Sequence, residues 1–185
     1  MLHQFKPFSF NFIIIATEGN IGLIKSTIRS IKINYKDFSY ICVVPKSIHD
    51  DSFEEIKAIC PCYKGKDTVT SLLNAGLTKG GKEWNMFVME GAWVKNGLDR
   101  KYSLYLESDN DIFFPIVANF DKGKNVKVFS TFDECTLNGL TIHQKMFKKN
   151  GKFADAPLEI SKLMWGIDAI VNGAKFKAIL GAKIC

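Results

Sequence analysis

Two carboxylates near the start of the last predicted helix stand where they could take up or release a proton. Glu159 precedes Leu163 by four residues and Ile167 by eight, so it shares the helix face that carries these apolar side chains. We expect this face to point inward, and an inward carboxylate is unusual unless it is hydrogen-bonded or takes part in acid–base chemistry. The alternatives are structural: Glu159 can serve as a favourable charge near a helix N-terminus, and Asp155 as a helix cap.

Two other side chains could contact a substrate. His143 ends a short predicted strand that begins at Leu140, and it could ligate a metal, contact substrate or be a hydrogen-bonded partner within the core. Trp93 could stack against the apolar face of a sugar ring. The acidic cluster at residues 107–111 lacks the glycine and the distal glutamate of a calcium-binding loop, so we expect a solvated loop there.

The cysteines do not form a recognisable disulfide or zinc pattern. Their number is odd, and Cys60-Pro61-Cys62 has no second cysteine pair to complete a zinc site. The N-terminus has no cleavable signal pattern, and no apolar run reaches the roughly 18 residues of a membrane-spanning helix. We therefore expect reduced thiols, no membrane span and a cytoplasmic protein.

Basic residues exceed acidic ones, with 25 Lys and Arg against 19 Asp and Glu and a net charge of +6. This excess favours an anionic partner such as a phosphorylated small molecule, an acidic lipid or a nucleic acid. The lysines are spread along the chain without a run of five or more, which makes a nucleic-acid partner unlikely. The length of 185 residues fits one domain over residues 1–185.

The first elements form a β-strand, helix, β-strand unit. Residues 10–16 are a short β-branched apolar run that predicts a buried strand, and residues 40–44 predict a second one. Between them, apolar residues recur at helical spacing: Ile24, Ile28 and Ile31. A unit of this kind predicts parallel strands joined by a right-handed crossover.

The rest of the chain continues the alternation of helices and strands. We expect helices at 52–59 and 67–80, strands at 84–89, 112–117, 126–129, 140–143 and 176–180, and a final helix that starts near Pro157. The apolar stripe expected to hold that last helix to the core consists of Leu163, Ile167, Ile170 and Val171. The fold class predicted is α/β, with a mostly parallel Rossmann-like sheet and helices on both faces.

The order of these pieces resembles a glycosyltransferase of the GT-A fold, and in particular the inverting, nucleotide-sugar-dependent family 2. Four segments carry the resemblance: FIIIATEGNIGLIKSTIRSI, YICVVP, LLNAGLTKGGKEWNMFVMEG and LNGLTIHQKMFKKNGKFADAPLEISKLMWGIDAIVNG. They match, in order, the family's first strand and helix, its second strand, the segment that ends in its D-x-D motif, and its acceptor-side segment.

The resemblance implies a site for a nucleotide-sugar donor and an acceptor. The donor would contact Thr17 and Glu18 after the first strand, and Asn74 and Gly76, which match an Asn-x-Gly pattern. Without the resemblance, these residues are an ordinary loop and an ordinary amphipathic helix. Open α/β sheets bind ligands beyond the carboxyl ends of their strands, so the expected place has a general physical basis.

The resemblance also implies the reaction. The family's acidic pair maps near Asp155 or Glu159, and one of them would take the proton from the attacking acceptor hydroxyl. The acceptor would be a saccharide or another hydroxyl compound. Its binding surface could also involve a homo-oligomer or a partner subunit.

Two motifs of the family are replaced in this sequence. Pro45 and Lys46 stand where an Asp pair is usual, and Met89-Glu90-Gly91 stands where the family has the D-x-D that holds Mn²⁺ or Mg²⁺. Glu90 could still hold a metal; otherwise the leaving-group charge would fall to cations such as Lys95, Arg100 and Lys101. These losses also favour a second hypothesis, a catalytically inactive sugar- or nucleotide-binding module of the same fold.

Overall fold

The computed structural model describes residues 10–35, 38–103, 110–116, 118–120, 126–128, 136–180 and 184. The strands are β1 (Phe10–Ile15), β2 (Ser39–Pro45), β3 (Cys62–Gly65), β4 (Trp84–Met89), β5 (Ile112–Ile116), β6 (Ala118–Phe120), β7 (Val126–Val128), β8 (Thr141–His143) and β9 (Phe176–Leu180). The helices are α1 (Ile21–Asn34), α2 (Asp50–Lys57), α3 (Val69–Gly80), α4 (Leu98–Ser103), α5 (Gln144–Asn150) and α6 (Leu158–Val171).

The main sheet is mixed but mostly parallel. Its strand order is β3-β2-β1-β4-β8-β5-β9, and β8 is antiparallel to both of its neighbours. The remaining pairs are parallel, with β1 between β2 and β4 at the centre. The chain thus leaves β1 toward β2 on one side and later returns to β4 on the other, which makes the β1–β4 border a topological switch point.

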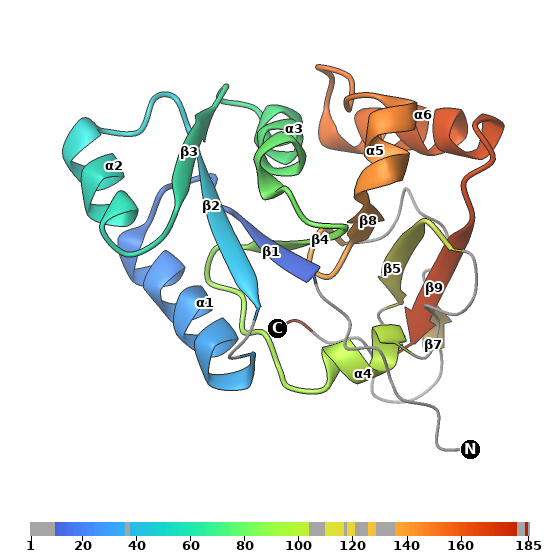
Figure 1. Ribbon diagram of the computed structural model, residues 1–185, viewed down its shortest axis with the longest axis horizontal. Coiled ribbons are helices and arrows are strands. Elements are labelled where there is room, and N and C mark those ends of the chain that lie inside the picture. Colours follow the sequence, from blue (N-terminus) through green and yellow to red (C-terminus); the bar gives the residue numbers. More distant parts are fainter. Residues whose placement is uncertain are drawn as a thin grey trace.

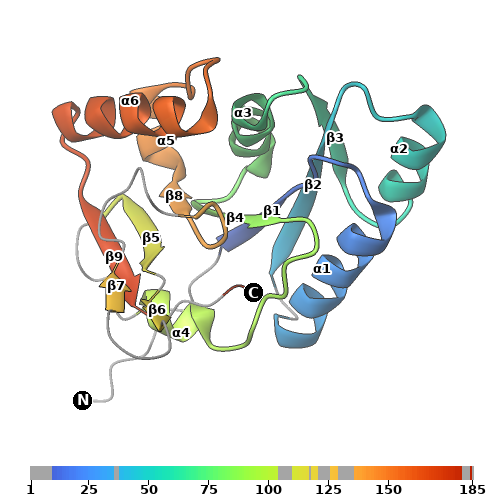
Figure 2. The ribbon, with the colours of Figure 1, turned by 180° about the vertical axis from the view of Figure 1, so that it is seen from behind.

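Helices cover both faces of this sheet, as the sequence predicts (Figure 1). One core packs α1, α2 and α4 against one face, with Ile24, Ile56 and Tyr102 among its buried members. The other packs α3, α5 and α6 against the opposite face, with Leu73 and Trp165 among its buried members. The view from behind shows the same two layers, with α3, α5 and α6 together on one side (Figure 2).

The central strands form where the sequence is most apolar. Residues 12–15 of β1 are fully buried, so both faces of the strand are covered and an unbroken apolar run is the stable choice. Helix α1 begins where the Asn20 side chain accepts a hydrogen bond from the Leu23 N–H, a standard N-cap. Helix α3 ends at Gly81, whose φ of 67° is the left-handed conformation expected of a glycine C-cap.

Four short elements are not predicted from the sequence, and one of them is the three-residue strand β6. The strand β3 is the tetrapeptide CYKG, which is too short and polar to show an alternating pattern. Helix α5 has the sequence QKMFKKN, in which only Met146 and Phe147 are buried. Helix α4 lies in a stretch where no helix was expected. Each element is held mainly by tertiary packing, which local patterns do not report.

The predicted inward stripe of α6 is wrong. Leu163, Ile167, Ile170 and Val171 are 48–81% exposed, and the buried residues of the helix are Ser161, Lys162, Trp165, Gly166 and Ala169. Glu159 is therefore exposed and not part of an inward face. The physical reason is that Trp165 stacks on Phe153 with ring centroids 4.7 Å apart, and this large contact turns the smaller apolar residues outward.

Three of the cysteines are free and buried: Cys42, Cys60 and Cys62. Hydrogen bonds with the two neighbouring thiols, together with burial, raise the pKa of the Cys42 thiol. Among the described residues, no three His, Cys, Asp or Glu side chains are grouped so that they could hold a metal ion. Cys135 and Cys185 lie outside those residues.

Some sequence expectations fall on residues outside the described ranges. These include most of the acidic cluster at 107–111 and the last residues of the strands expected at 112–117 and 126–129. Over the part of the chain that is described, none of the helices combines the length and hydropathy needed to cross a bilayer.

The close packing of α3 on β1 gives a direct test of the fold. A Cβ added at Gly76 would lie 2.4 Å from Cγ2 of Ile13, so we expect Gly76→Ala to lower the free energy of unfolding by about 1–3 kcal/mol. Gly22→Ala in the exposed first turn of α1 is the matched control, expected to change stability by less than about 0.5 kcal/mol. Urea unfolding of both variants measures this, and equal stabilities would contradict the packing described here.

Candidate functional site

Glu90 ties together the loops that follow the two central strands. Its Oε1 accepts a hydrogen bond from the Glu18 backbone N–H at 2.6 Å, and its Oε2 accepts one from the Asn20 N–H at 3.0 Å. The Thr17 hydroxyl lies 3.4 Å from Oε1 and also donates to it. The negative charge thus sits at the N-terminus of α1, where the helix dipole favours it. The result is a loop of defined shape at the switch point of the sheet.

The same hydrogen bonds decide whether Glu90 can hold a metal ion, a question that the resemblance to D-x-D enzymes left open. Both carboxylate oxygens of Glu90 already accept backbone N–H groups, and the neighbouring Met89 and Gly91 offer no side-chain oxygen. A divalent cation such as Mg²⁺ or Mn²⁺ binds through several oxygen ligands. The residues present do not fit such an ion.

The loops after β2 and β3 join the same edge of the sheet. The Ser47 N–H donates to Asp67 Oδ1 at 2.9 Å, and this hydrogen bond holds the pKa of the Asp67 carboxyl below its usual range. A Cβ at Gly19 would lie 2.5 Å from Cδ1 of Ile48, so the loop after β1 touches the loop after β2. The ends of four parallel strands are therefore connected by direct contacts.

Asp155 lies at this edge as well. Its Oδ1 is 3.4 Å from the Thr68 hydroxyl, and its Oδ2 is 3.8 Å from Nζ of Lys66. It lines a cavity of about 330 Å³ between the first residues of α3 and of α6, formed by residues 68–70 and 155–158. The cavity thus has a mostly apolar lining that includes the Asp155 carboxylate and two threonines at the start of α3, a combination of apolar walls with a few polar groups that is common in ligand sites.

The loop that carries Asp155 is held firmly. The side-chain amide of Asn74 donates to the Phe153 carbonyl at 2.9 Å and accepts from the Phe153 N–H at 2.8 Å. The Trp165 indole donates to the Gly151 carbonyl at 2.9 Å, and the Phe153 ring stacks on that indole. Asn74 therefore acts on this loop, while Gly76, two residues on, packs against Ile13 in the core.

Two other predicted site residues are exposed. Trp93 is 40% exposed, but the adjacent Val94 N–H donates to Ser30 Oγ at 3.0 Å and the Val94 carbonyl accepts from Asn34 Nδ2 at 2.8 Å, so the chain at Trp93 already runs along α1 away from the carboxyl edge. Glu159 is exposed on the first turn of α6, four residues after Asp155. Of the two acidic candidates, Asp155 is the one among the residues that line the cavity.

The structure does not bring His143 to the carboxyl edge of the sheet. It pairs with Trp84, the first residue of β4, and so lies at the opposite edge, about 16 Å from the end of that strand. Its Nδ1 caps α5 through the Lys145 N–H at 3.0 Å, and its Nε2 is 3.2 Å from Oε1 of Glu83. These contacts describe a hydrogen-bonded structural histidine.

Lys95, Arg100 and Lys101, the cations expected to offset the leaving-group charge, also lie away from the carboxyl edge. The Tyr35 hydroxyl at the C-terminal end of α1 donates to the Lys95 carbonyl at 2.7 Å and accepts from the Leu98 N–H at 2.9 Å. Since α1 starts at the carboxyl edge and runs for about 21 Å, this holds the backbone at Lys95 and the start of α4 near the amino edge. Two lysines that follow parallel strands, Lys46 and Lys66, are exposed at the carboxyl edge.

Sequence reasoning missed Lys66, Asp67 and Thr68. Thr68 is the N-cap of α3, and its hydroxyl accepts from the Ser71 N–H at 3.3 Å. The signal was present in the segment KDTVTS, since a threonine directly before Val69, the first residue of the apolar stripe, is a typical N-cap. Thr68 could not be placed at the carboxyl edge because β3, the strand before it, was not recognised.

Comparison with known proteins shows the fold. No family model matches the chain, and no curated protein matches its sequence. Among solved structures, S. aureus TarS aligns over 96% of this chain and 36% of its own, with 13% identity and a TM-score of 0.66. Two structures of TarS 1–349 align over 96% of this chain as well: the complex with UDP at 12% identity and TM-score 0.67, and the complex with UDP-GlcNAc at 14% and 0.64.

The chain spans only part of these proteins, 59% and 57% of the two TarS 1–349 chains. At this identity the likeness establishes a shared architecture. The chain therefore has a glycosyltransferase-like α/β fold.

Proposed function

We propose that this protein transfers a sugar from a nucleoside-diphosphate donor to a hydroxyl acceptor, with inversion at the anomeric carbon, as in family 2 of the GT-A glycosyltransferases. The observation that carries the proposal is the Asp155 carboxylate in a cavity at the carboxyl edge of the sheet. The TarS structures of the same architecture contain UDP or UDP-GlcNAc, which supports a uridine-diphosphate sugar as donor.

The donor is proposed to lie along the loops at the β1–β4 switch point. Thr17 and Glu18 belong to the loop that Glu90 holds in shape, so they would meet the nucleoside without a large ordering cost. Lys46 is exposed after β2, where it can face the diphosphate.

The acceptor is proposed to bind in the cavity beside Asp155. The acceptor oxygen forms a bond to the anomeric carbon while the bond from that carbon to the diphosphate oxygen breaks. Asp155 takes the proton of the acceptor hydroxyl, and the nucleoside diphosphate leaves with the electron pair. Lys46 and Lys66 would offset the negative charge that develops on the leaving group. Asn74 would act as a positioning residue, since it holds the loop of Asp155.

A second candidate function is a binding module that retains the donor site without catalysis. The observation that favours it is the engagement of both Glu90 oxygens by backbone N–H groups, in place of a metal-binding D-x-D. The two functions differ in turnover, not in donor binding, so they can be separated experimentally.

Donor binding is tested by thermal stabilisation with UDP-, GDP- and dTDP-sugars, each with and without Mn²⁺. A ligand at 100 times its Kd stabilises by about 2.7 kcal/mol, which raises the Tm of a domain of this size by several degrees. We expect the uridine series to stabilise, without dependence on Mn²⁺. Failure of all three series would remove the proposed function, and a strict Mn²⁺ requirement would return Glu90 to a metal-binding role.

The Glu90 interaction can be tested with the isosteric variant Glu90→Gln. A glutamine amide cannot accept hydrogen bonds at both positions, so we expect a loss of about 1–2 kcal/mol in unfolding free energy and weaker uridine-nucleotide binding. Glu54→Gln, which alters an exposed ion pair on α2, is the control and should change neither quantity. Titration calorimetry measures the binding; unchanged affinity in Glu90→Gln would mean that the loop shape is irrelevant to the donor.

The two acidic candidates can be separated by a pair of variants. We expect Asp155→Asn to lower donor turnover, measured as release of nucleoside diphosphate, by about 100-fold or more while donor binding is kept. Glu159→Gln should keep turnover within a few-fold. The reverse result would assign the base to Glu159, and absence of turnover in the unaltered protein with intact donor binding would favour the binding module.

A further inference from the structure

Helix α6 presents a continuous apolar surface to solvent, which we call the α6 seam. Its members are Ile160, Leu163, Met164, Ile167, Ile170 and Val171, which are 48–81% exposed. The other face of the same helix is fixed against the protein through Trp165 and Ala169. Figure 1 shows α6 at the outer margin of the molecule, beside α5. Contiguous apolar surfaces of this kind mark interaction sites on soluble proteins.

The spacing of the seam fits another helix. Ile160, Leu163, Ile167 and Ile170 follow one another at intervals of three, four and three residues. This is the alternation by which side chains of one helix insert between those of a partner helix. Met164 and Val171 widen the stripe on one side. The seam therefore has the pattern of a helix–helix contact.

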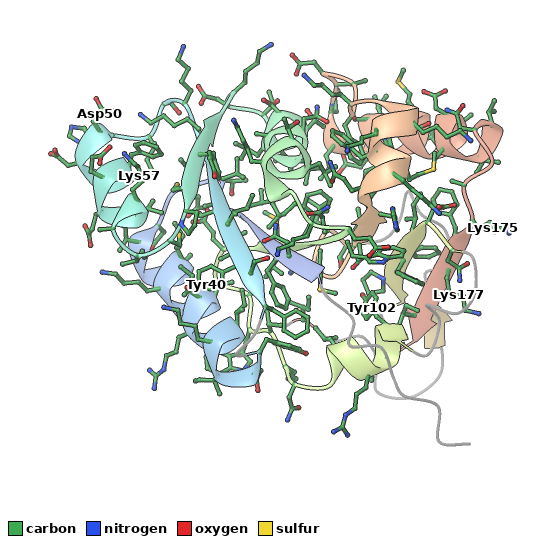
Figure 3. All side chains as sticks on the ribbon, viewed as in Figure 1. Tyr40, Asp50, Lys57, Tyr102, Lys175 and Lys177 are labelled. Carbon is green, nitrogen blue, oxygen red and sulfur yellow. The ribbon has the colours of Figure 1, made fainter. Side chains whose placement is uncertain are left out.

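Charges at the two ends of the helix favour an antiparallel arrangement. Glu159 is exposed on the first turn, close to the seam. At the other end, the exposed Lys149 donates through Nζ to the carbonyl of Asn172, the C-cap of α6. Lys175 follows three residues later, below the C-terminal end of the helix (Figure 3). An antiparallel copy of α6 would place the acidic end of one helix beside the basic end of the other.

We propose that two copies of this chain associate through the α6 seam, as a two-fold antiparallel helix pair. Each copy then buries the same apolar surface, as a two-fold interface requires. Glu159 of each protomer faces Lys149 of the partner subunit at both ends of the pair. The proposal concerns only α6 and its surroundings, and it does not rest on the proposed transferase activity.

An anionic lipid surface is the other partner that an exposed apolar helix can take. The helix residues that flank the seam argue against it, since Glu159 and Asp168 are both exposed and acidic. Helices that lie on membranes usually carry Lys or Arg in these flanking positions. A partner helix with a basic end would pair with the Glu159 carboxylate. An anionic lipid headgroup would repel the same carboxylate.

The mass in solution tests the proposal. Light scattering and sedimentation equilibrium of the full chain, from nanomolar to high micromolar concentration, should show a transition from 20.8 kDa to twice that mass. Ile167→Glu at the centre of the seam should weaken association by about 100-fold or more. Ile33→Glu is the matched control, because Ile33 is also an exposed apolar helix residue, 57% exposed on α1. It should associate like the unaltered protein.

The antiparallel arrangement is tested by exchanging charges. Glu159→Lys and Lys149→Glu should each weaken association, and the double variant should recover it, because each restored pair is intermolecular. Circular dichroism and thermal unfolding show whether each variant is folded. Failure of the double variant to recover association, while folded, would overturn the antiparallel pairing.

Two further results would overturn the proposal as a whole. One is a monomer throughout the concentration range, or a dimer that Ile167→Glu leaves unchanged. The other is a monomer that sediments with phosphatidylglycerol vesicles and loses this binding in Ile167→Glu, which would assign the seam to lipid. Nucleotide-sugar binding measured on the same samples is independent of either result.

Discussion

The carboxylate of Glu90 joins the central strands of this molecule at the carboxyl edge of the sheet. It stands at the end of β4 and accepts N–H groups from the loop after β1, so the ends of the two central strands behave as one unit. A charged acceptor on backbone N–H groups contributes about 1.5–3 kcal/mol in favourable cases. The loop held in this way carries Gly19, which touches Ile48 after β2, and the contacts continue from Ser47 to Asp67. The candidate site depends on this chain of contacts.

Prediction from the sequence succeeded where a single physical pattern dominates. The strands β1, β2 and β4 are mainly apolar and lie in the centre of a sheet, and α1 and α3 carry clear helical stripes with recognisable ends. The Gly76→Ala prediction belongs to this well-determined part, because Gly76 lies where α3 meets β1. The α/β class with helices on both faces followed from these elements alone.

The helix α6 shows why the remainder could not be predicted. Both of its faces carry apolar residues, so periodicity alone offers two candidate inward faces. The choice is decided by the stacking of Trp165 on Phe153, a contact between segments whose meeting no local pattern reports. The wrong choice of inward face also led to a wrong expectation for the site, because Glu159 was expected to point inward on that face. Asp155 was named as a candidate from the sequence, but its contacts with Thr68 and Lys66 could not be predicted because strand β3 was not recognised.

The antiparallel direction of β8 means that two different parts of the chain form the candidate site, and the sequence of one can vary more freely than that of the other. Because β8 ends at the amino edge, α5 and residues 151–157 carry the chain back to the carboxyl edge, where Asp155 lies. The loops at the β1–β4 border come from the parallel half and do not share this route. Exchanges at Ala156, which lines the cavity, can therefore reshape it without moving Thr17 or Glu90, as long as Phe153 keeps its stack on Trp165. One side of the candidate site is free to vary while the geometry of the other side stays fixed.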